Sequence, residues 1–450
     1  MNMEKDLKQA LKKGMQRRSF VKNSAVAAGG IILSPFAANA SGYFSSVDDT
    51  IKIALVGCGG RGTGATVQAL STKENVKLVA MADAFKDRLD KSYENILAQE
   101  TYDATAKVDV KDETKFIGFE AYKEAIDMAD VVILATPPGF RPIHFEYAVE
   151  QGKHIFMEKP VATDVPGIRK VLAAAEKAKQ KKLNVVVGLQ RHYQTSYREL
   201  MDRIHNGEIG DIVSAQAYWD GAGVWVRERE EGQTEMEYQM RNWYYFNWLC
   251  GDHITEQHVH NIDVINWAKN AYPVKAQGMG GREVRNGKEF GEIFDHHFVE
   301  FEYADGTILS SQCRHIKGCM NRVSEAIQGT KGRATTQGGT IITDLKGKTI
   351  WKHRGKNDPN PYQQEHDELF AAIAAGEYKF ADAENGAKST MTSLLGRMAT
   401  YSGQEITWDD AMKSDLSLMP ATFAWDANPP IMPDQDGFYP VAIPGVTKVL

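Results

Sequence analysis

The feature that most constrains the fold is a glycine-rich loop set between a strand and a helix. Ile51-Lys52-Ile53-Ala54-Leu55-Val56 is a β-branched run that predicts a buried strand. It leads directly into a GxGxxG match, and residues 63–70 continue as a small-residue helix. Glycines at this spacing allow a tight turn and let the backbone approach a pyrophosphate at the helix N-terminus. The expected dinucleotide contacts in this loop are Gly57, Gly59, Gly60, Arg61 and Gly62.

An acidic residue at the end of the next strand favours one cofactor over another. Residues 76–82 predict a second strand, which ends at Asp83, 21 residues beyond Gly62. A carboxylate at that place bonds the adenine-ribose hydroxyls and repels a 2′-phosphate. We therefore expect NAD rather than NADP, although NADP is not excluded because Arg88 lies nearby in the sequence.

Two later strands carry further polar residues to the same edge of the sheet. Residues 130–136 predict a buried parallel strand, and the strand over residues 154–157 leads into Glu158-Lys159-Pro160. Ligands of open α/β sheets bind outside the carboxyl ends of the strands. We therefore expect Lys159 beside the nicotinamide end of the dinucleotide. The cofactor contacts expected from these two strands are Thr136, Pro137, Glu158 and Lys159.

The second half of the chain changes to antiparallel patterning. Strand-like runs occur at residues 212–219, 273–280, 293–303 and 307–315, and helices are expected over residues 363–375 and 383–402. Asp305-Gly306 between two of these runs predicts a β-hairpin. We therefore predict an α/β + α+β chain, whose N-terminal Rossmann domain precedes a domain with a large open, mostly antiparallel sheet. The predicted boundaries are a signal peptide at 1–40, the Rossmann domain at 50–165, a substrate and oligomerisation domain at 166–365, helices that pack back on the Rossmann domain at 366–415, and an extended C-terminal arm at 416–450.

A polar stretch from Gly251 to Asp263 is rich in histidine and acidic residues. If it is helical, one face within about a third of the circumference holds four of them, with His258 almost opposite His260. That face consists of His253, Glu256, His260 and Asp263. Three interpretations stay open: a metal site, an acid/base pair in which Glu256 orients His260, or a hydrogen-bonded polar seam. The spacing lacks the i,i+4 histidine pair of common zinc helices, so no metal is expected.

Taken in this order, the motifs resemble those of the glucose–fructose oxidoreductase, inositol dehydrogenase and rhizopine-catabolism family (Gfo/Idh/MocA). The resemblance covers roughly residues 50–415 and rests on the glycine loop, Asp83, Glu158-Lys159-Pro160 and Glu256-x-x-x-His260. It implies that Lys159 positions and polarises a reacting hydroxyl and that His260 is the acid/base. Two departures stand out: Glu256 occupies the place of the family's usual aspartate, and His258 stands where a glycine is common.

The reaction that this resemblance implies is hydride transfer from a carbinol carbon to the nicotinamide while a base removes the hydroxyl proton. The expected substrate is a sugar, sugar alcohol or glycoside, with Lys159, His260 and Glu256 as the catalytic set. The candidate substrate contacts are Arg191, His192, Tyr193, Trp243, Tyr244 and His258. Two alternatives remain: an NAD-dependent glycosidase that uses transient oxidation and elimination, and a non-catalytic sugar or dinucleotide sensor.

The N-terminal residues have the pattern of an export signal. Arg17-Arg18-Ser19-Phe20 resembles the twin-arginine motif, and an apolar stretch from Ala25 to Leu33 precedes the small-x-small site Ala38-Asn39-Ala40. This pattern predicts export by the twin-arginine translocase into the periplasm, with NAD tightly bound before export. A basic tail or an uncleaved anchor is the alternative.

Composition narrows the range of partners. The net charge is −6 without a basic block beyond the N-terminus, so no nucleic acid partner is expected. No apolar run reaches the roughly 18–20 residues that span a bilayer. The four cysteines match no zinc or redox spacing. The extended arm and the open sheet lead us to expect a homo-oligomer.

Overall fold

The structure is a computed structural model that describes residues 50–450. The predicted signal peptide and its cleavage site, residues 1–40, lie outside the described residues. Within residues 50–450, no helix has both the length and the hydropathy needed to cross a bilayer. Cys58, Cys250 and Cys313 are buried, Cys319 is exposed, and all four are free thiols.

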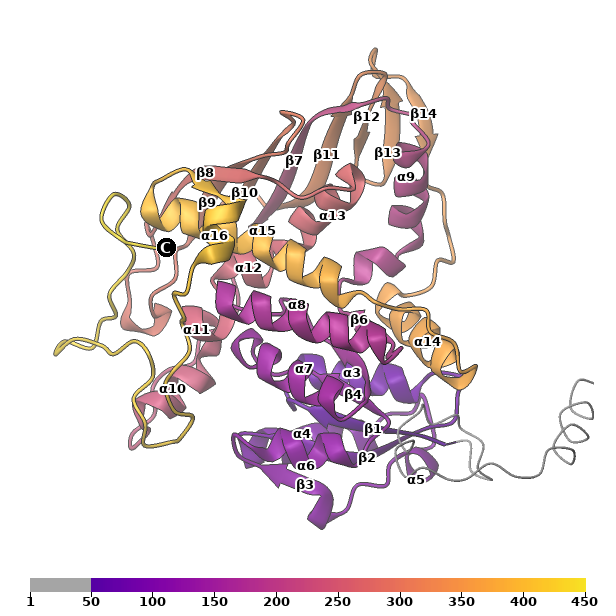
Figure 1. The fold of residues 1–450 in the computed structure, drawn as a ribbon, viewed down its shortest axis with the longest axis vertical. Coiled ribbons are helices and arrows are strands. Elements are labelled where there is room, and N and C mark those ends of the chain that lie inside the picture. Colours follow the sequence, from indigo (N-terminus) through magenta and orange to yellow (C-terminus); the bar gives the residue numbers. More distant parts are fainter. Residues whose placement is uncertain (1–49) are drawn as a thin grey trace, which may run out of the picture. The chain divides into compact units, whose positions relative to one another are not determined.

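The first sheet is the predicted Rossmann sheet, with six parallel strands in the order β3-β2-β1-β4-β5-β6 (Figure 1). The strands are β1 (Ile51–Val56), β2 (Val76–Asp83), β3 (Lys115–Ile117), β4 (Val131–Leu134), β5 (His154–Met157) and β6 (Val185–Val187). Its helices are α3 (Gly60–Leu70), α4 (Lys86–Leu97), α5 (Ala104–Lys107), α6 (Ala121–Asp127), α7 (Arg141–Glu150) and α8 (Val165–Gln180). Every residue of β4 and β6 is buried, as expected for strands covered on both faces.

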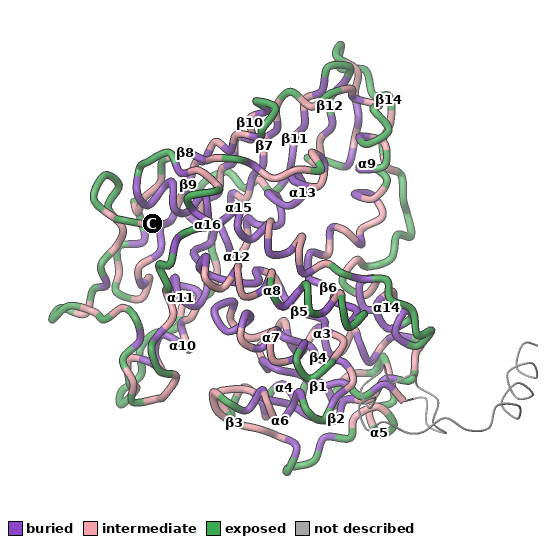
Figure 2. The backbone as a smooth tube through the Cα atoms, in the orientation of Figure 1, coloured by how far each residue is buried: buried purple, intermediate pink, exposed green. Residues whose placement is uncertain are grey.

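Alternate residues of β1 explain how the helices are divided between the two faces. Ile53 and Leu55 belong to a core cluster shared with α3, α4 and α14 (Pro361–Ala374). Ala54 and Val56 belong to a second cluster shared with α6, α7 and α8. Because successive side chains of a strand point to opposite faces, the helices must lie on both sides of the sheet. In Figure 2 the inner strands of this sheet are largely buried, whereas the edge strand β3 has no buried residue.

The predicted domain boundary at residue 165 is too early. β6 pairs with β5 in parallel and completes the first sheet, so the nucleotide-binding fold continues to about Gly188. The reason is physical: Val185, Val186 and Val187 are wholly apolar and need helices on both faces. The turn at Lys159-Pro160 ends a strand within this fold and does not end the domain.

The second sheet has nine strands in the order β14-β13-β12-β11-β7-β10-β9-β8-β15, and only the β7–β10 pair is parallel. The strands are β7 (Ile212–Gly221), β8 (Lys275–Gly281), β9 (His296–Glu302), β10 (Ile308–His315), β11 (Arg322–Gly329), β12 (Gly332–Thr335), β13 (Ile341–Asp344), β14 (Thr349–Lys352) and β15 (Ile406–Thr407). This confirms the prediction of a large, mostly antiparallel sheet. Gly306 forms the predicted turn between β9 and β10 with φ +81°.

Helices cover one face of the second sheet. The remaining helices are α9 (Thr195–His205), α10 (Glu235–Arg241), α11 (Asn247–Cys250), α12 (His253–Glu256), α13 (Val259–Lys269), α15 (Ala383–Ser402) and α16 (Trp408–Lys413). Short 3-10 helices occur at Asp112–Thr114, Pro138–Phe140, Gln190–Tyr193, Trp243–Tyr245 and Lys288–Phe290. α15 packs against β8 and β9 on one side and against α8 on the other, so it joins the two domains (Figure 1). α14 packs against α3 of the first domain.

The C-terminal arm follows α16 as an extended segment without helix or strand. It packs on its own chain: the Trp425 ring lies 4.6 Å from the Phe119 ring and 5.0 Å from the Phe85 ring. Further along, the Tyr439 ring lies 4.9 Å from that of Phe246. The arm therefore contacts both the nucleotide-binding domain and the segment around α10 and α11.

Candidate active site

A cavity of about 650 Å³ lies at the carboxyl edge of the first sheet and is closed by residues of the second domain. Strand ends β1, β2, β4 and β5 each contribute to its wall. The sequence-predicted residues that line it are Gly57, Gly59, Gly60, Arg61, Asp83, Arg88, Thr136, Pro137, Glu158, Lys159, Trp243, Glu256 and His260. The structure thus brings the expected cofactor and catalytic residues to one cavity.

The glycine loop leaves space where a dinucleotide would lie. A Cβ at Gly57 would come within 2.4 Å of the Thr136 backbone nitrogen, and one at Gly62 within 2.0 Å of the Gly57 oxygen. Nothing lies within 4 Å of a Cβ built on Gly59 or Gly60. Gly57 and Gly62 are therefore required for packing, whereas Gly59 and Gly60 keep the cavity open beside the N-terminus of α3. Such a cradle fits a pyrophosphate.

Asp83 ends β2 with its carboxylate anchored at the cavity. The backbone N–H of Cys58 donates to Oδ2 at 2.7 Å, and that of Phe85 donates to Oδ1 at 2.8 Å. Burial raises the pKa of Asp83, while these two backbone donors lower it. Each oxygen keeps a second lone pair, so the pair of oxygens fits the two hydroxyls of an NAD ribose.

Lys159 is held at the cavity by Glu256 from the second domain. Its Nζ lies 3.1 Å from Glu256 Oε1 and donates to the Glu256 main-chain oxygen at 2.5 Å. Both side chains are largely but not fully buried, at 13% and 14% exposed. Glu158, the preceding residue, instead forms an ion pair with Arg61 of the glycine loop. Lys159 is therefore fixed between the two domains and still reaches the cavity.

His260 lies in the same cavity as a neutral imidazole. Burial, together with the charges of Lys159 and Arg191, holds the pKa of His260 well below its usual value. Its Nδ1 is buried and has no hydrogen-bond partner within residues 50–450, and its ring lies 6.0 Å from that of Trp219. A neutral imidazole is able to accept a proton. The prediction that Glu256 orients His260 is wrong, because the Glu256 carboxylate forms an ion pair with Lys159.

The predicted continuous helix around these residues is interrupted. α12 ends at Glu256 and α13 begins at Val259. The four residues expected on one face therefore separate: His253 turns into the interior, while Asp263 accepts a hydrogen bond from His192 at 2.7 Å. The interpretation of this face as a metal site is therefore wrong.

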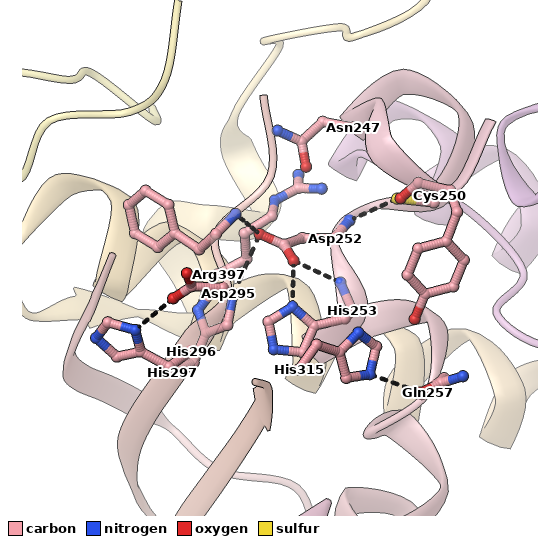
Figure 3. A network of polar contacts seen from close by, with 12 residues as sticks. Asn247, Cys250, Asp252, His253, Gln257, Asp295, His296, His297, His315 and Arg397 are labelled. Atoms are coloured by element: carbon pink, nitrogen blue, oxygen red, sulfur yellow. Dashed lines mark hydrogen bonds and ion pairs between the residues drawn. The ribbon is translucent and has the colours of Figure 1, made fainter. Parts of the chain in front are cut away.

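His253 belongs to a buried polar network centred on Asp252 (Figure 3). Asp252 accepts from His253 Nδ1 at 2.7 Å and from Tyr401 Oη at 2.6 Å, and its Oδ2 lies 3.2 Å from His297 Nε2. Burial alone raises the pKa of Asp252, but His297 and His253 bring it well below its usual value. Asp252, His253 and His297 form the one group of three potential metal-ligating side chains found in the described part of the chain. His315, which stacks on His253, connects this network to Gln257 at the cavity wall through a 2.8 Å hydrogen bond.

Of the six predicted substrate contacts, Trp243 lines the cavity and the other five do not. Among them, Arg191 pairs with Glu325 at 2.5 Å, and His258 contacts Ser311 at 2.7 Å. The five residues are Arg191, His192, Tyr193, Tyr244 and His258. Tyr193 donates to Asp382, and Tyr244 is buried with no hydrogen-bond partner for its hydroxyl within residues 50–450. Arg191, His192 and Tyr193 follow the buried strand β6. Their side chains contact residues of the second half of the chain that pack on this end of the strand.

Several lining residues were missed by sequence reasoning. They are Gln190, Trp219, Trp225, Arg227, Gln257 and Tyr362. Trp219 ends the predicted strand at residues 212–219, which was a usable signal because residues at strand ends often reach ligands. Trp225 and Arg227 lie in a segment without helix or strand, where no local pattern identifies a cavity wall.

Comparison with known proteins gives consistent family matches. Residues 51–188 match the model of the GFO/IDH/MocA "Oxidoreductase family, NAD-binding Rossmann fold", and residues 197–335 match the "GFO/IDH/MocA C-terminal domain". An inositol 2-dehydrogenase of Serratia proteamaculans is 26% identical over 262 residues, which cover 57% of this chain and 65% of that protein. The chain thus spans about two thirds of the length of that relative.

Two further proteins match over a longer part of the chain. A glycosyl hydrolase family 109 protein of Shewanella pealeana is 21% identical over 329 residues, 68% of this chain and 67% of that protein. The structure of scyllo-inositol dehydrogenase from Lactobacillus casei with bound NAD(H) and scyllo-inositol is 21% identical and covers 80% of this chain and 99% of its own, with a TM-score of 0.58. This last likeness shows the shared fold.

Proposed function

Because this chain belongs to the Gfo/Idh/MocA oxidoreductase family, we propose that it transfers hydride between NAD and a hydroxyl-bearing carbon of a sugar, sugar alcohol or glycoside. One observation carries this proposal. Lys159, Glu256 and His260 line the same cavity as the open glycine loop. The relatives named as inositol dehydrogenases support the same class of substrate.

The chain's own residues supply the proton chemistry. NAD, when bound, supplies the hydride acceptor. The Lys159 ammonium, fixed by Glu256, donates to the substrate oxygen and stabilises the negative charge that develops there. Neutral His260 accepts the hydroxyl proton.

We also propose that NAD is tightly bound, and the C-terminal arm supports this. Phe85 and Phe119 line the cavity beside Asp83, and Trp425 of the arm packs on both rings. Arg241 of α10 lies 4.0 Å over the Phe85 ring and makes two hydrogen bonds to Asp87, at 2.9 and 3.0 Å. Arm and α10 together hold the two phenylalanines that wall the cavity beside Asp83, where the adenine ribose would lie.

Tight binding of NAD is consistent with export of the protein in the folded state, because the cofactor would be bound before export. We propose that the twin-arginine translocase exports the protein with its cofactor and that it acts in the periplasm as a homo-oligomer. The support is the Arg17-Arg18 motif and the packing of Trp425 on two residues that line the cavity. Native mass spectrometry of protein purified from the periplasm tests both points, since it reports bound NAD and the number of subunits. Empty monomers in the cytoplasm would contradict them.

A second candidate is an NAD-dependent glycosidase, favoured by the family 109 relative that matches over 68% of this chain. In this reaction, transient oxidation would acidify a neighbouring C–H, and elimination would release the protonated aglycone. Water would then add to the unsaturated keto-sugar, and the hydride would return to the carbonyl carbon. Product analysis on a panel of sugars and aryl glycosides separates the candidates. A keto-sugar with reduced NAD supports the oxidoreductase, whereas free aglycone with unchanged NAD supports the glycosidase. If the panel yields neither product, both candidate functions are wrong.

A further inference from the structure

The segment from Val224 to Arg227 places alternate side chains in the core and in the cavity wall. Val224 and Val226 pack against the aromatic core cluster around α10 and α11. The alternate residues, Trp225 and Arg227, line the cavity instead. One side of this segment therefore anchors it, and the other side faces the cavity.

Trp225 presents unusual apolar surface to the cavity. Trp225 is 40% exposed, whereas the other seven tryptophans of the chain are buried or half-buried. Its ring contacts Trp243 at 5.8 Å and Tyr244 at 6.4 Å, both at steep angles that leave part of the indole uncovered. Exposed aromatic surface in a cavity is stabilised when a ligand covers it.

Arg227 offers unused hydrogen-bond donors at the same place. Its backbone N–H donates to Asn242 Oδ1 at 2.8 Å, which fixes the main chain. Its guanidinium lies 5.4 Å from the centre of the Trp225 ring, and the structure shows no hydrogen bond or ion pair to it from residues 50–450. A guanidinium has five N–H donors in a rigid plane, which suits pairs of hydroxyl oxygens.

A third indole in the cavity lies beside the reacting groups. Trp219 at the end of β7 lines the cavity and lies beside His260, with 6.0 Å between the rings. A sugar ring oxidised at Lys159 and His260 would therefore contact Trp219. Trp225, Trp243 and Arg227 would remain for a further unit attached to that ring.

We propose that Trp225, Trp243 and Arg227 form a subsite for a second sugar ring, so that the preferred substrate is a glycoside of at least two sugar units. This inference rests on the proposed function. The outer ring packs its C–H face on Trp225, and its hydroxyl oxygens accept from Arg227. The subsite selects against free monosaccharides and inositols, which leave these side chains uncovered.

The test compares a disaccharide with its monosaccharide for wild-type protein and variants. Cellobiose and glucose, then lactose and galactose, are assayed by keto-sugar formation in single turnovers at several sugar concentrations, with the bound NAD as the hydride acceptor, and bound NAD is measured in each preparation. We expect Trp225→Ala to lower the ratio of kcat/KM values, disaccharide over monosaccharide, by roughly tenfold, the effect of about 1.4 kcal/mol. Trp225→Phe should restore most of this ratio, and Arg227→Met should lower it. Trp351→Ala, on β14 outside the cavity, is the matched control and should keep the wild-type ratio.

The outcomes distinguish failure of the subsite from failure of the proposed oxidoreductase function. Wild-type oxidation of both sugars with equal kcat/KM, or a ratio unaltered in Trp225→Ala, would overturn the subsite and leave the oxidoreductase intact. Loss of bound NAD in Trp225→Ala would also overturn it, because Trp225 would then support the cofactor. If wild-type protein with bound NAD oxidises no sugar, the proposed function and the subsite fall together.

Discussion

Removing the Trp425 side chain tests whether the C-terminal arm retains the cofactor. Trp425 makes two ring contacts, at 5.0 Å to Phe85 and 4.6 Å to Phe119, and both phenylalanines line the cavity. Each aromatic pair contributes about 0.5–1.5 kcal/mol beyond area burial, so the two together contribute about 1–3 kcal/mol. If NAD leaves only after these contacts break, Trp425→Ala should speed its dissociation by about fivefold to about a hundredfold.

The assay follows release of bound NAD by displacement with an excess of a fluorescent NAD analogue. Phe438→Ala is the matched control, because Phe438 lies on the same arm but is 43% exposed, and its ring contacts the Lys288 ammonium. Thermal unfolding of both variants checks that the fold is intact. An unchanged dissociation rate in folded Trp425→Ala would refute the retention argument.

Three further changes have effects that follow directly from the structure. Asp83→Asn removes the charge that disfavours a 2′-phosphate, so the preference for NAD over NADP, measured as the ratio of their dissociation constants, should fall by roughly tenfold; an unchanged ratio would contradict this role. The pKa of His260 is held well below 6.5, so the group stays neutral through that pH and kcat/KM should show no inflection there; an inflection at 6.5 that disappears in His260→Gln would contradict the lowered pKa. Asp252→Asn should cost about 3 kcal/mol of unfolding free energy in urea at pH 7, because donors that face a buried carboxylate lose its charge. Since the folded pKa of Asp252 is depressed, its contribution is present above the unfolded value near 3.8 and is lost as pH falls through the folded value, so the variant should be less acid-sensitive than wild type.

The nucleotide-binding half could be predicted well because its signals are local. The strand before Gly57, the glycines and Asp83 follow one another within a single βαβ unit, and a parallel sheet brings strand ends to one edge. Lys159 could be placed at the cavity by the same rule. The boundary at residue 165 was wrong because β6 joins the sheet only after a further helix.

The second half of the site depends on contacts between remote segments, which no local pattern shows. Arg191 looked like an exposed substrate contact, but Glu325, 134 positions away, neutralises it in the interior. The face expected from His253 to Asp263 assumed an unbroken helix. Asp252 has φ +70° and is fully buried, the helix breaks at Gln257 and His258, and His253 contacts His297 of β9 with 4.8 Å between the rings. Only the tertiary fold reveals that Trp225 and Arg227 face the cavity.

The most direct test of the central claim is single-turnover oxidation by Lys159→Met with NAD content measured in the same sample. Lys159 contacts Glu256 across the cavity rather than forming the glycine cradle, so the variant should keep NAD bound. Loss of the donor at the reacting hydroxyl should lower the rate by roughly 10²- to 10⁴-fold. Full NAD occupancy with turnover abolished is the predicted result. Turnover within a few-fold of wild type, with NAD bound, would contradict the assignment of Lys159 to the chemistry.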